Sequence, residues 1–150
     1  MMLAGAGVFA AIQWRRPAPV VTREAQWQPY VDFGKTFAER MIAFDPRTSD
    51  TAFDWVADNS TGEFRKLFEA QRPSIIKSLT DSGYTTTANV TSSGVKSVNH
   101  QSGTAVILVA ASSTTTDRAG VKQDPKQHQL VMSIERIDGA FKASKIEFVS

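Results

Sequence analysis

The chain has 150 residues, of which 41% are hydrophobic and 21% charged, so it can bury one core and is neither a disordered nor a collagen-like chain. It contains no cysteine, which excludes disulfides and thiolate metal sites. The net charge of +2 reflects Arg15 and Arg16, because from Pro17 onward fifteen basic residues oppose fifteen acidic ones. This balance lacks the basic face that nucleic-acid binding needs, so we expect no nucleic-acid partner.

Residues 1–16 open with an apolar run, MMLAGAGVFAAIQW, in which Gln13 is the one polar residue. As a helix this run would be about 21 Å long, shorter than the roughly 30 Å hydrocarbon core of a bilayer. We expect a membrane anchor or its remnant in residues 1–16; the alternatives are the apolar region of a signal peptide and a buried helix of the fold. The basic pair that follows favours a cytoplasmic domain by the positive-inside rule, so these residues leave the membrane orientation open.

Residues 17–21, with Pro17 and Pro19, are expected to form a linker to a domain over residues 22–150. Thr22 is placed to cap a first helix, Pro29 predicts a kink or a late start in it, and Asp45-Pro46 ends it. Its apolar residues recur every three or four positions, which is the helical period: Tyr30, Phe33, Phe37, Met41 and Phe44.

Two shorter helices are predicted next. One covers Asp50 to Ala57, and the other begins behind Ser60-Thr61-Gly62-Glu63, which has the S-x-x-E spacing of a capping box. We expect the Glu63 side chain to reach back to the cap. Pro73 removes one backbone donor, so this third helix should bend or break near Arg72.

After Gly83 the chain becomes rich in threonine, serine and valine, which favours strands. The first is expected from Thr85 to about Val98, with a bulge at Ser93-Gly94. The second runs from Thr104 to about Thr115, and its apolar run Ala105–Ala111 predicts a strand covered on both faces. The third and fourth, Gln127–Ile137 and Phe141–Val149, are joined by Asp138-Gly139, the strongest hairpin signal in the chain.

Three helices followed by four antiparallel strands predict an α+β domain in which the helices pack on one face of a curved sheet. This order resembles the nuclear transport factor 2-like, or cystatin-like, cone. A narrower resemblance is carried by motifs in a fixed order after an apolar N-terminal segment. These motifs are Phe44-Asp45, then Thr61, Gly62, Glu63 and Phe64, then Pro73-Ser74, a valine-rich strand pair, and Ile137, Asp138 and Gly139 before an aromatic strand.

Taken together, residues 22–150 resemble the actinobacterial Mce-associated membrane proteins. The resemblance implies a single-pass anchor, an extracytoplasmic domain and a non-enzymatic role in stabilising or assembling an Mce-type importer of lipids or sterols. It implies Mce transporter subunits or other envelope proteins as partners, and no cofactor. Two alternatives stay open: an inner-membrane assembly factor of a type IV secretion system, and a lipid-binding or enzymatic pocket in the same fold.

The side chains that could carry chemistry have plainer interpretations. His100 and His128 have no third ligand at a suitable spacing, so we expect no metal site and place both histidines at an exposed turn and strand edge. Asp54 and Asp58 share a helical face that we expect to be solvated. Tyr30 and Tyr84 face no identifiable carboxylate, so we expect no enzyme. Five aromatic residues are expected to form the core or to line an apolar pocket: Phe33, Phe37, Trp55, Phe64 and Phe68.

Overall fold

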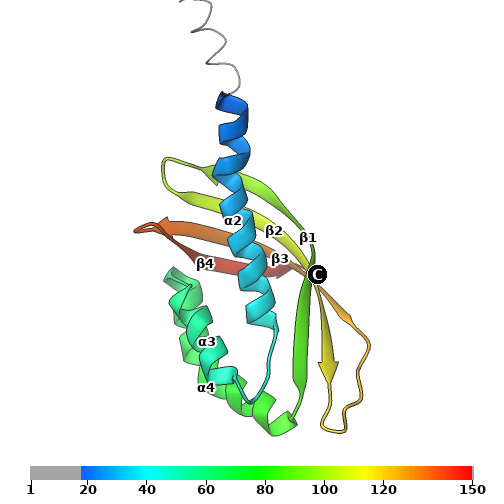
Figure 1. Ribbon diagram of the computed structural model, residues 1–150. Coiled ribbons are helices and arrows are strands. Elements are labelled where there is room, and N and C mark those ends of the chain that lie inside the picture. Colours follow the sequence, from blue (N-terminus) through cyan, green and yellow to red (C-terminus); the bar gives the residue numbers. More distant parts are fainter. Residues whose placement is uncertain (1–17, 150) are drawn as a thin grey trace, which may run out of the picture.

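The computed structural model describes residues 18–149, which form three helices on one side of a curved four-stranded sheet (Figure 1). The strands pair antiparallel in the order β1-β2-β3-β4. This arrangement confirms the predicted α+β class. The elements in chain order are α2 (Ala18–Ile42), α3 (Ser49–Asp58), α4 (Gly62–Ser82), β1 (Thr85–Asn99), β2 (Thr104–Thr116), β3 (Lys126–Ile137) and β4 (Ala140–Val149).

Helix α2 starts earlier than the sequence predicted. Residues 18–21, expected in a linker, are helical, so Thr22 lies within the helix and is not its N-cap. Pro29 lies inside the helix and is not its start. The predicted apolar stripe faces the sheet, with Tyr30, Phe37 and the following Phe44 all buried.

Strand β2 shows that the sheet has one packed face and one open face. Ala105, Ile107, Val109 and Ala111 are buried beneath the helices, whereas Leu108 between them is 44% exposed. The prediction that β2 is covered on both faces is therefore wrong. The reason is that all three helices lie on the same side of the sheet (Figure 1). Alternate side chains of β2 point to the other side, where no described helix covers them.

Strand β1 bends along its length (Figure 1). Its pairing with β2 shifts register between Val90 and Ser92 and again between Val95 and Ser97. The predicted irregularity is thus present, but its predicted place at Ser93-Gly94 is wrong: those two residues pair regularly between the two shifts. Each extra residue increases the local twist, so two separated shifts curve the sheet around the helices.

The two connections between the helices bind the edges of the sheet. Phe44 exchanges two backbone hydrogen bonds with Thr86 of β1, each 2.8 Å long. On the opposite edge, Ala143 of β4 donates to the Asn59 carbonyl at 2.9 Å and accepts from the Thr61 N–H at 2.8 Å. The helical layer is therefore hydrogen-bonded to both edge strands, which closes the sides of the cone.

The start of α4 differs from the predicted capping box. Thr61 is the N-cap residue and makes no side-chain cap bond, while the Ser60 hydroxyl donates to the Ala57 carbonyl at 2.9 Å. No bond from Glu63 to the cap is present among the described residues, and its side chain is exposed. Ser60 is buried against β4, where its backbone forms a bridge with Ala143. Its hydroxyl therefore bonds a carbonyl at the end of α3 and does not cap α4.

Helix α4 continues from Gly62 to Ser82 with Pro73 inside it, so the break expected near Arg72 does not occur. The β3–β4 turn and the buried face of β3 agree with the sequence predictions. Asp138 and Gly139 both have positive φ, 51° and 81°, as a two-residue type I′ hairpin requires, and Ile137 pairs with Ala140 across them. On β3 the alternating Leu130, Met132 and Ile134 are all buried, as predicted.

Candidate functional site

The five aromatic residues singled out in the sequence lie together between the helices and the sheet. Phe37 is at the centre, fully buried, with ring centroids 5.7 Å from Phe33 and 5.8 Å from both Trp55 and Phe64. Phe68 stacks on Phe64 at 5.9 Å. Most of this surface is packed ring against ring; Trp55 also lines one cleft and Phe68 another.

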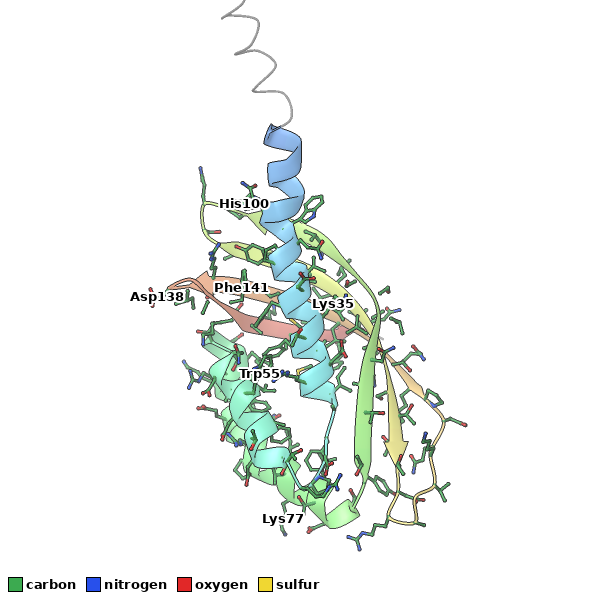
Figure 2. The ribbon with its side chains drawn as sticks, in the orientation of Figure 1. Lys35, Trp55, Lys77, His100, Asp138 and Phe141 are labelled. Atoms are coloured by element: carbon green, nitrogen blue, oxygen red, sulfur yellow. The ribbon has the colours of Figure 1, made fainter. Side chains whose placement is uncertain are left out.

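The residues of the family motif lie in two turns beside β4. Thr61 and Gly62 form the entry to α4 beside β4, where Gly62 has φ of 62°. Asp138 lies at the tip of the β3–β4 turn (Figure 2). The structure therefore assigns these residues to backbone turns and does not bring them into one site.

A first cleft, of about 440 Å³, lies between α2, α3 and the start of β1. The Arg40 guanidinium is 4.4 Å from the centre of the Trp55 ring in its wall, a cation–π contact. Asp45 is at its rim, and the side-chain hydrogen bond from Arg47 holds the pKa of that carboxyl below its usual value. Threonines supply most of the other polar groups: Thr48, Thr51, Thr85, Thr86 and Thr87.

A second cleft, of about 310 Å³, lies where the helical layer meets the ends of β3 and β4, and we call it the cone cleft. Its only polar side chain is His128, whose Nε2 is 2.7 Å from the Ser113 hydroxyl. The other lining residues are apolar and come from α2, the segment after it, α3, α4 and β4: Met41, Ile42, Ala43, Phe44, Phe53, Phe68, Ile75, Leu79 and Phe148.

The two histidines differ in their surroundings. His100 is exposed at the β1–β2 turn, as predicted (Figure 2). For His128 the prediction of an exposed strand edge is wrong: it is half-buried on the inner face of β3, opposite Ala111 of β2. No carboxylate in the described part of the chain bonds to His128, so Ser113 and His128 form a pair without a third member. Nor do residues 18–149 bring three His, Asp or Glu side chains together as a metal-binding group.

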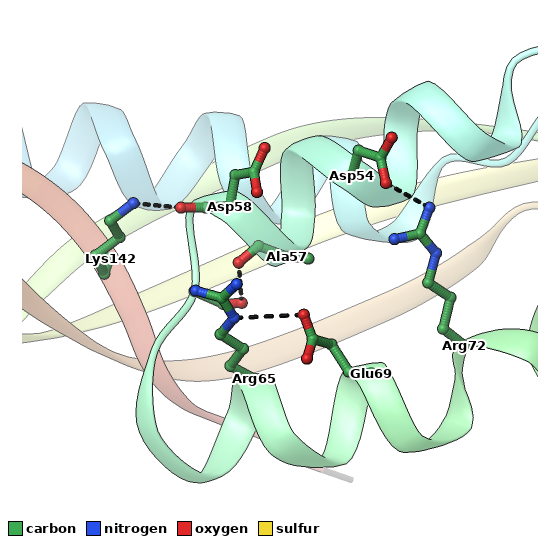
Figure 3. Close-up of polar contacts among 8 residues, drawn as sticks. Asp54, Ala57, Asp58, Arg65, Glu69, Arg72 and Lys142 are labelled. Carbon is green, nitrogen blue, oxygen red and sulfur yellow. Dashed lines mark hydrogen bonds and ion pairs between the residues drawn. The ribbon is translucent and has the colours of Figure 1, made fainter.

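The Asp54 carboxylate and the backbone carbonyls of Asp50 and Asp58 on α3 accept hydrogen bonds from neighbouring elements (Figure 3). Asp54 accepts a hydrogen bond of 2.7 Å from Arg72 of α4, and Arg72 also donates to the Asp50 carbonyl at 3.1 Å. The Asp58 carbonyl accepts from Lys142 of β4. The carboxylates of Asp54 and Asp58 are exposed, as the predicted solvated face implies.

The feature that sequence reasoning missed is the outer face of the sheet. Leu108 and Val149 are 44% and 47% exposed there, and Val106, Ala110 and Val131 are half-buried. A shallow hollow of about 450 Å³ is lined by Leu108, Ala110, Val131 and Val149, with Ser92, Gly94 and Gln129 also on its walls. We call Val106, Leu108, Ala110, Val131 and Val149 the outer-face patch. Polar residues on the adjoining strands, Ser97, Gln127 and Ser133 among them, were the signal that this face is open to solvent.

The predicted anchor, residues 1–16, lies outside the described residues. Within residues 18–149, none of the helices combines the length and the apolar character needed to cross a bilayer.

Comparison with known proteins places this fold among its relatives. A family model described as "Uncharacterized protein Rv1363c/MT1408-like" matches residues 1–150. The Mycobacterium tuberculosis protein described as "Uncharacterized protein Rv1363c" is 39% identical over 94 residues, which is 63% of this chain and 35% of that protein. The matched segment therefore spans about a third of this longer relative.

Three solved structures share the fold at low sequence identity. The TraE protein in complex with 2-(2-furyl)isonicotinic acid has a TM-score of 0.62 and 16% identity, covering 76% of this chain and 89% of its own. CagV of Helicobacter pylori, a VirB8 homolog of a type IV secretion system, has a TM-score of 0.64 and 11% identity, covering 81% and 96%. An IcmL-like type IV secretion system protein of Legionella pneumophila has a TM-score of 0.66 and 8% identity, covering 81% and 91%.

Proposed function

Since the chain belongs to the Rv1363c/MT1408-like family and shares its fold with secretion-system domains, we propose that it is a non-enzymatic assembly domain of a cell-envelope complex. The motif resemblance leads to a more specific proposal: the chain is an extracytoplasmic domain that stabilises an Mce-type importer of lipids or sterols. In this proposal residues 1–16 tether the domain to the membrane.

The observation that carries the proposal is the outer-face patch. Apolar side chains gathered on an exposed, pleated surface with a polar rim are typical of protein–protein contacts. Leu108 is at the middle of the patch, because Val131 of β3 pairs with it on one side and Gly94 of β1 on the other. The small Gly94 leaves the Leu108 side chain accessible from the β1 side, so a partner that covers this face removes apolar surface from water.

The non-enzymatic part of the proposal is supported by what the polar groups contact. Asp54 is engaged with Arg72, and the Ser113–His128 pair has no carboxylate partner in the described part of the chain. Each of these groups has a hydrogen bond that contributes to holding two elements together. A catalytic acid or base would instead face a position where a substrate atom can sit.

A second candidate is an assembly factor of a type IV secretion system. The fold shared with TraE, CagV and the IcmL-like protein favours it. Both candidates use the domain in the same way and differ in the partner, so the same surface serves for both.

Co-purification from the native membrane tests the proposal and separates the candidates. Mce subunits recovered with the full chain support the importer role, and secretion components recovered in their place support the second candidate. Leu108→Asp should abolish recovery, because it puts a charge at the centre of the patch. Val121→Asp is the matched control, since Val121 is 59% exposed on the β2–β3 loop and away from the patch. Equal recovery with both variants, or neither partner set with the wild-type chain, would contradict the proposal.

A further inference from the structure

The cone cleft has a buried floor and a more exposed outer wall. The rings of Phe44 and Phe53 are 6.0 Å apart, those of Phe53 and Phe68 are 5.4 Å apart, and all three side chains are buried. The outer wall is formed by Ile75 and Leu79 of α4, both half-buried, and on β4 by Phe148, which is 61% exposed. The cleft is thus an apolar space that is buried at its base and accessible at its mouth.

The cleft exists because two elements end or diverge at this point. Helix α2 stops at Ile42, and the chain then crosses to the edge strand β1, where Phe44 pairs with Thr86. Beyond that point the inner face of the sheet has no helix directly upon it. The second half of α4 lies alongside, and Phe68 is the one buried residue among the described residues of α4. Apolar residues on both walls therefore face a gap that no side chain fills.

The lining of the cleft has no acidic side chain. No Asp or Glu lines it, and His128 is its one polar side chain. Lys126 precedes His128 by two residues on β3, so it is on the same face of the sheet, and it is exposed opposite Ser113. An apolar interior with a lysine two residues from its lining histidine, on the same face of the sheet, complements a molecule that has one apolar tail and one anionic head.

The volume limits the size of the tail. At about 310 Å³ the cleft has roughly twice the ~150 Å³ of an engineered apolar cavity that accepts benzene, and it is at the small end of ligand sites. A single alkyl chain of medium length fits this space, whereas a two-chain lipid or a fused-ring sterol would not be fully enclosed.

We propose that the cone cleft is a binding site for a single-chain anionic amphiphile, a medium-chain carboxylate, with its tail against Phe44, Phe53 and Ile75 and its carboxylate at Lys126 and His128. This is a small-molecule site on the inner face of the sheet, separate from the outer-face patch of the proposed function. Leu108→Asp should therefore leave it unchanged, so that one proposal can fail without the other.

The methionines provide a direct readout in the full chain. Labelled with 13C at the methyl group, Met41 reports on the cleft that it lines, and Met132 reports on the fully buried core. Titration with decanoate should shift the Met41 signal and leave the Met132 signal in place. An unmoved Met41 signal, or equal shifts of both, would overturn the proposal.

Two variants of α4 form a matched pair for the same titration. Ile75→Trp fills the cleft with a larger apolar ring and should weaken decanoate binding at least tenfold. Leu67→Trp makes a like change at a position that is 59% exposed on α4, outside the cleft lining, and should change binding less than twofold. Should Ile75→Trp fail to fold by circular dichroism, Leu79→Phe takes its place. Unchanged affinity in the folded cleft variant contradicts the site.

The head group is tested by ligands and by Lys126. Decan-1-ol should bind several-fold more weakly than decanoate to the wild-type chain, and Lys126→Gln should remove that difference. Equal binding of the two ligands to the wild-type chain would overturn the anionic part. Vesicles of phosphatidylglycerol should leave the Met41 signal unmoved; a shift with vesicles but not with decanoate would mean that the site takes a membrane lipid, contrary to the proposal.

Discussion

Gly34 of α2 lies against Ile107 at the centre of the sheet. A Cβ at position 34 would be 3.3 Å from the Ile107 Cγ2 and 3.5 Å from the Ile134 Cδ1, and Ile107 and Ile134 are both fully buried. The missing side chain is what lets α2 approach β2 and β3 so closely. Glycine lowers helix stability by about 1 kcal/mol relative to alanine, so this close approach offsets a local cost.

Replacing Gly34 with leucine should destabilise the domain by about 1–3 kcal/mol, because the new side chain must displace two β-branched residues that cannot leave the core. Thermal unfolding followed by circular dichroism measures this. Gly94→Val is the control, since a Cβ at position 94 meets no atom within 4 Å and valine suits a strand. A Gly34→Leu variant as stable as Gly94→Val would refute the close-approach interpretation.

Phe37 should be the most costly of the five clustered aromatic residues to truncate. It is fully buried and contacts three other rings, so Phe37→Ala should lose about 3–5 kcal/mol of unfolding free energy. Denaturant titration gives the value. Phe148→Ala removes the same atoms from a side chain that is 61% exposed and should cost under about 1 kcal/mol. Similar losses for both would mean that Phe37 does not centre the core.

The β3–β4 turn requires a left-handed residue at Gly139, where φ is 81°. Gly139→Val should destabilise the domain by about 1–2 kcal/mol, because a β-branched side chain clashes with the backbone at positive φ. Asp138→Asn should be close to neutral, since asparagine is also favoured in this turn. Urea unfolding of the two variants side by side tests the pair, and the opposite order of stability would contradict the type I′ turn.

Asp45 should titrate below the usual 3.8 of an aspartate, because the side-chain hydrogen bond from Arg47 favours its charged form and lowers its pKa. The sign follows from the lowered pKa: any stability that the pair contributes is present above pH 3.8 and is lost as the pH falls through the folded-state pKa. NMR titration of the carboxyl carbon measures the midpoint, and Arg47→Gln should move it upward. A midpoint that Arg47→Gln leaves in place would exclude this cause.

Patterns within a few residues predicted much of the fold. The three- and four-residue spacing from Tyr30 to Phe44 gave the buried face of α2, and the alternation of Leu130, Met132 and Ile134 gave the buried face of β3. The aromatic cluster was also predictable, because its members recur at helical spacing on three successive segments. Which of them line a cleft could not be read from spacing, since Trp55 and Phe68 face different clefts.

The wrong predictions share a cause. The predicted capping box at Ser60 was wrong because Ser60 pairs with Ala143 of β4, which lies 83 residues further along the chain. The apolar run of β2 predicted cover on both faces, but an apolar run does not say how many helices will pack on it. His128 was placed at an exposed edge because nothing near it in the chain shows that α4 and β4 enclose it.

By itself, the sequence determined the order and type of the elements, the position of the hairpin at Asp138-Gly139 and the α+β class, because hydrophobic period and turn chemistry are properties of short segments. Only the tertiary structure decided that the outer-face patch stays open, that a cleft remains beneath the end of α2, and that His128 lines this cleft. These features depend on which surfaces meet after the chain has folded, and those contacts join residues that are far apart in the sequence.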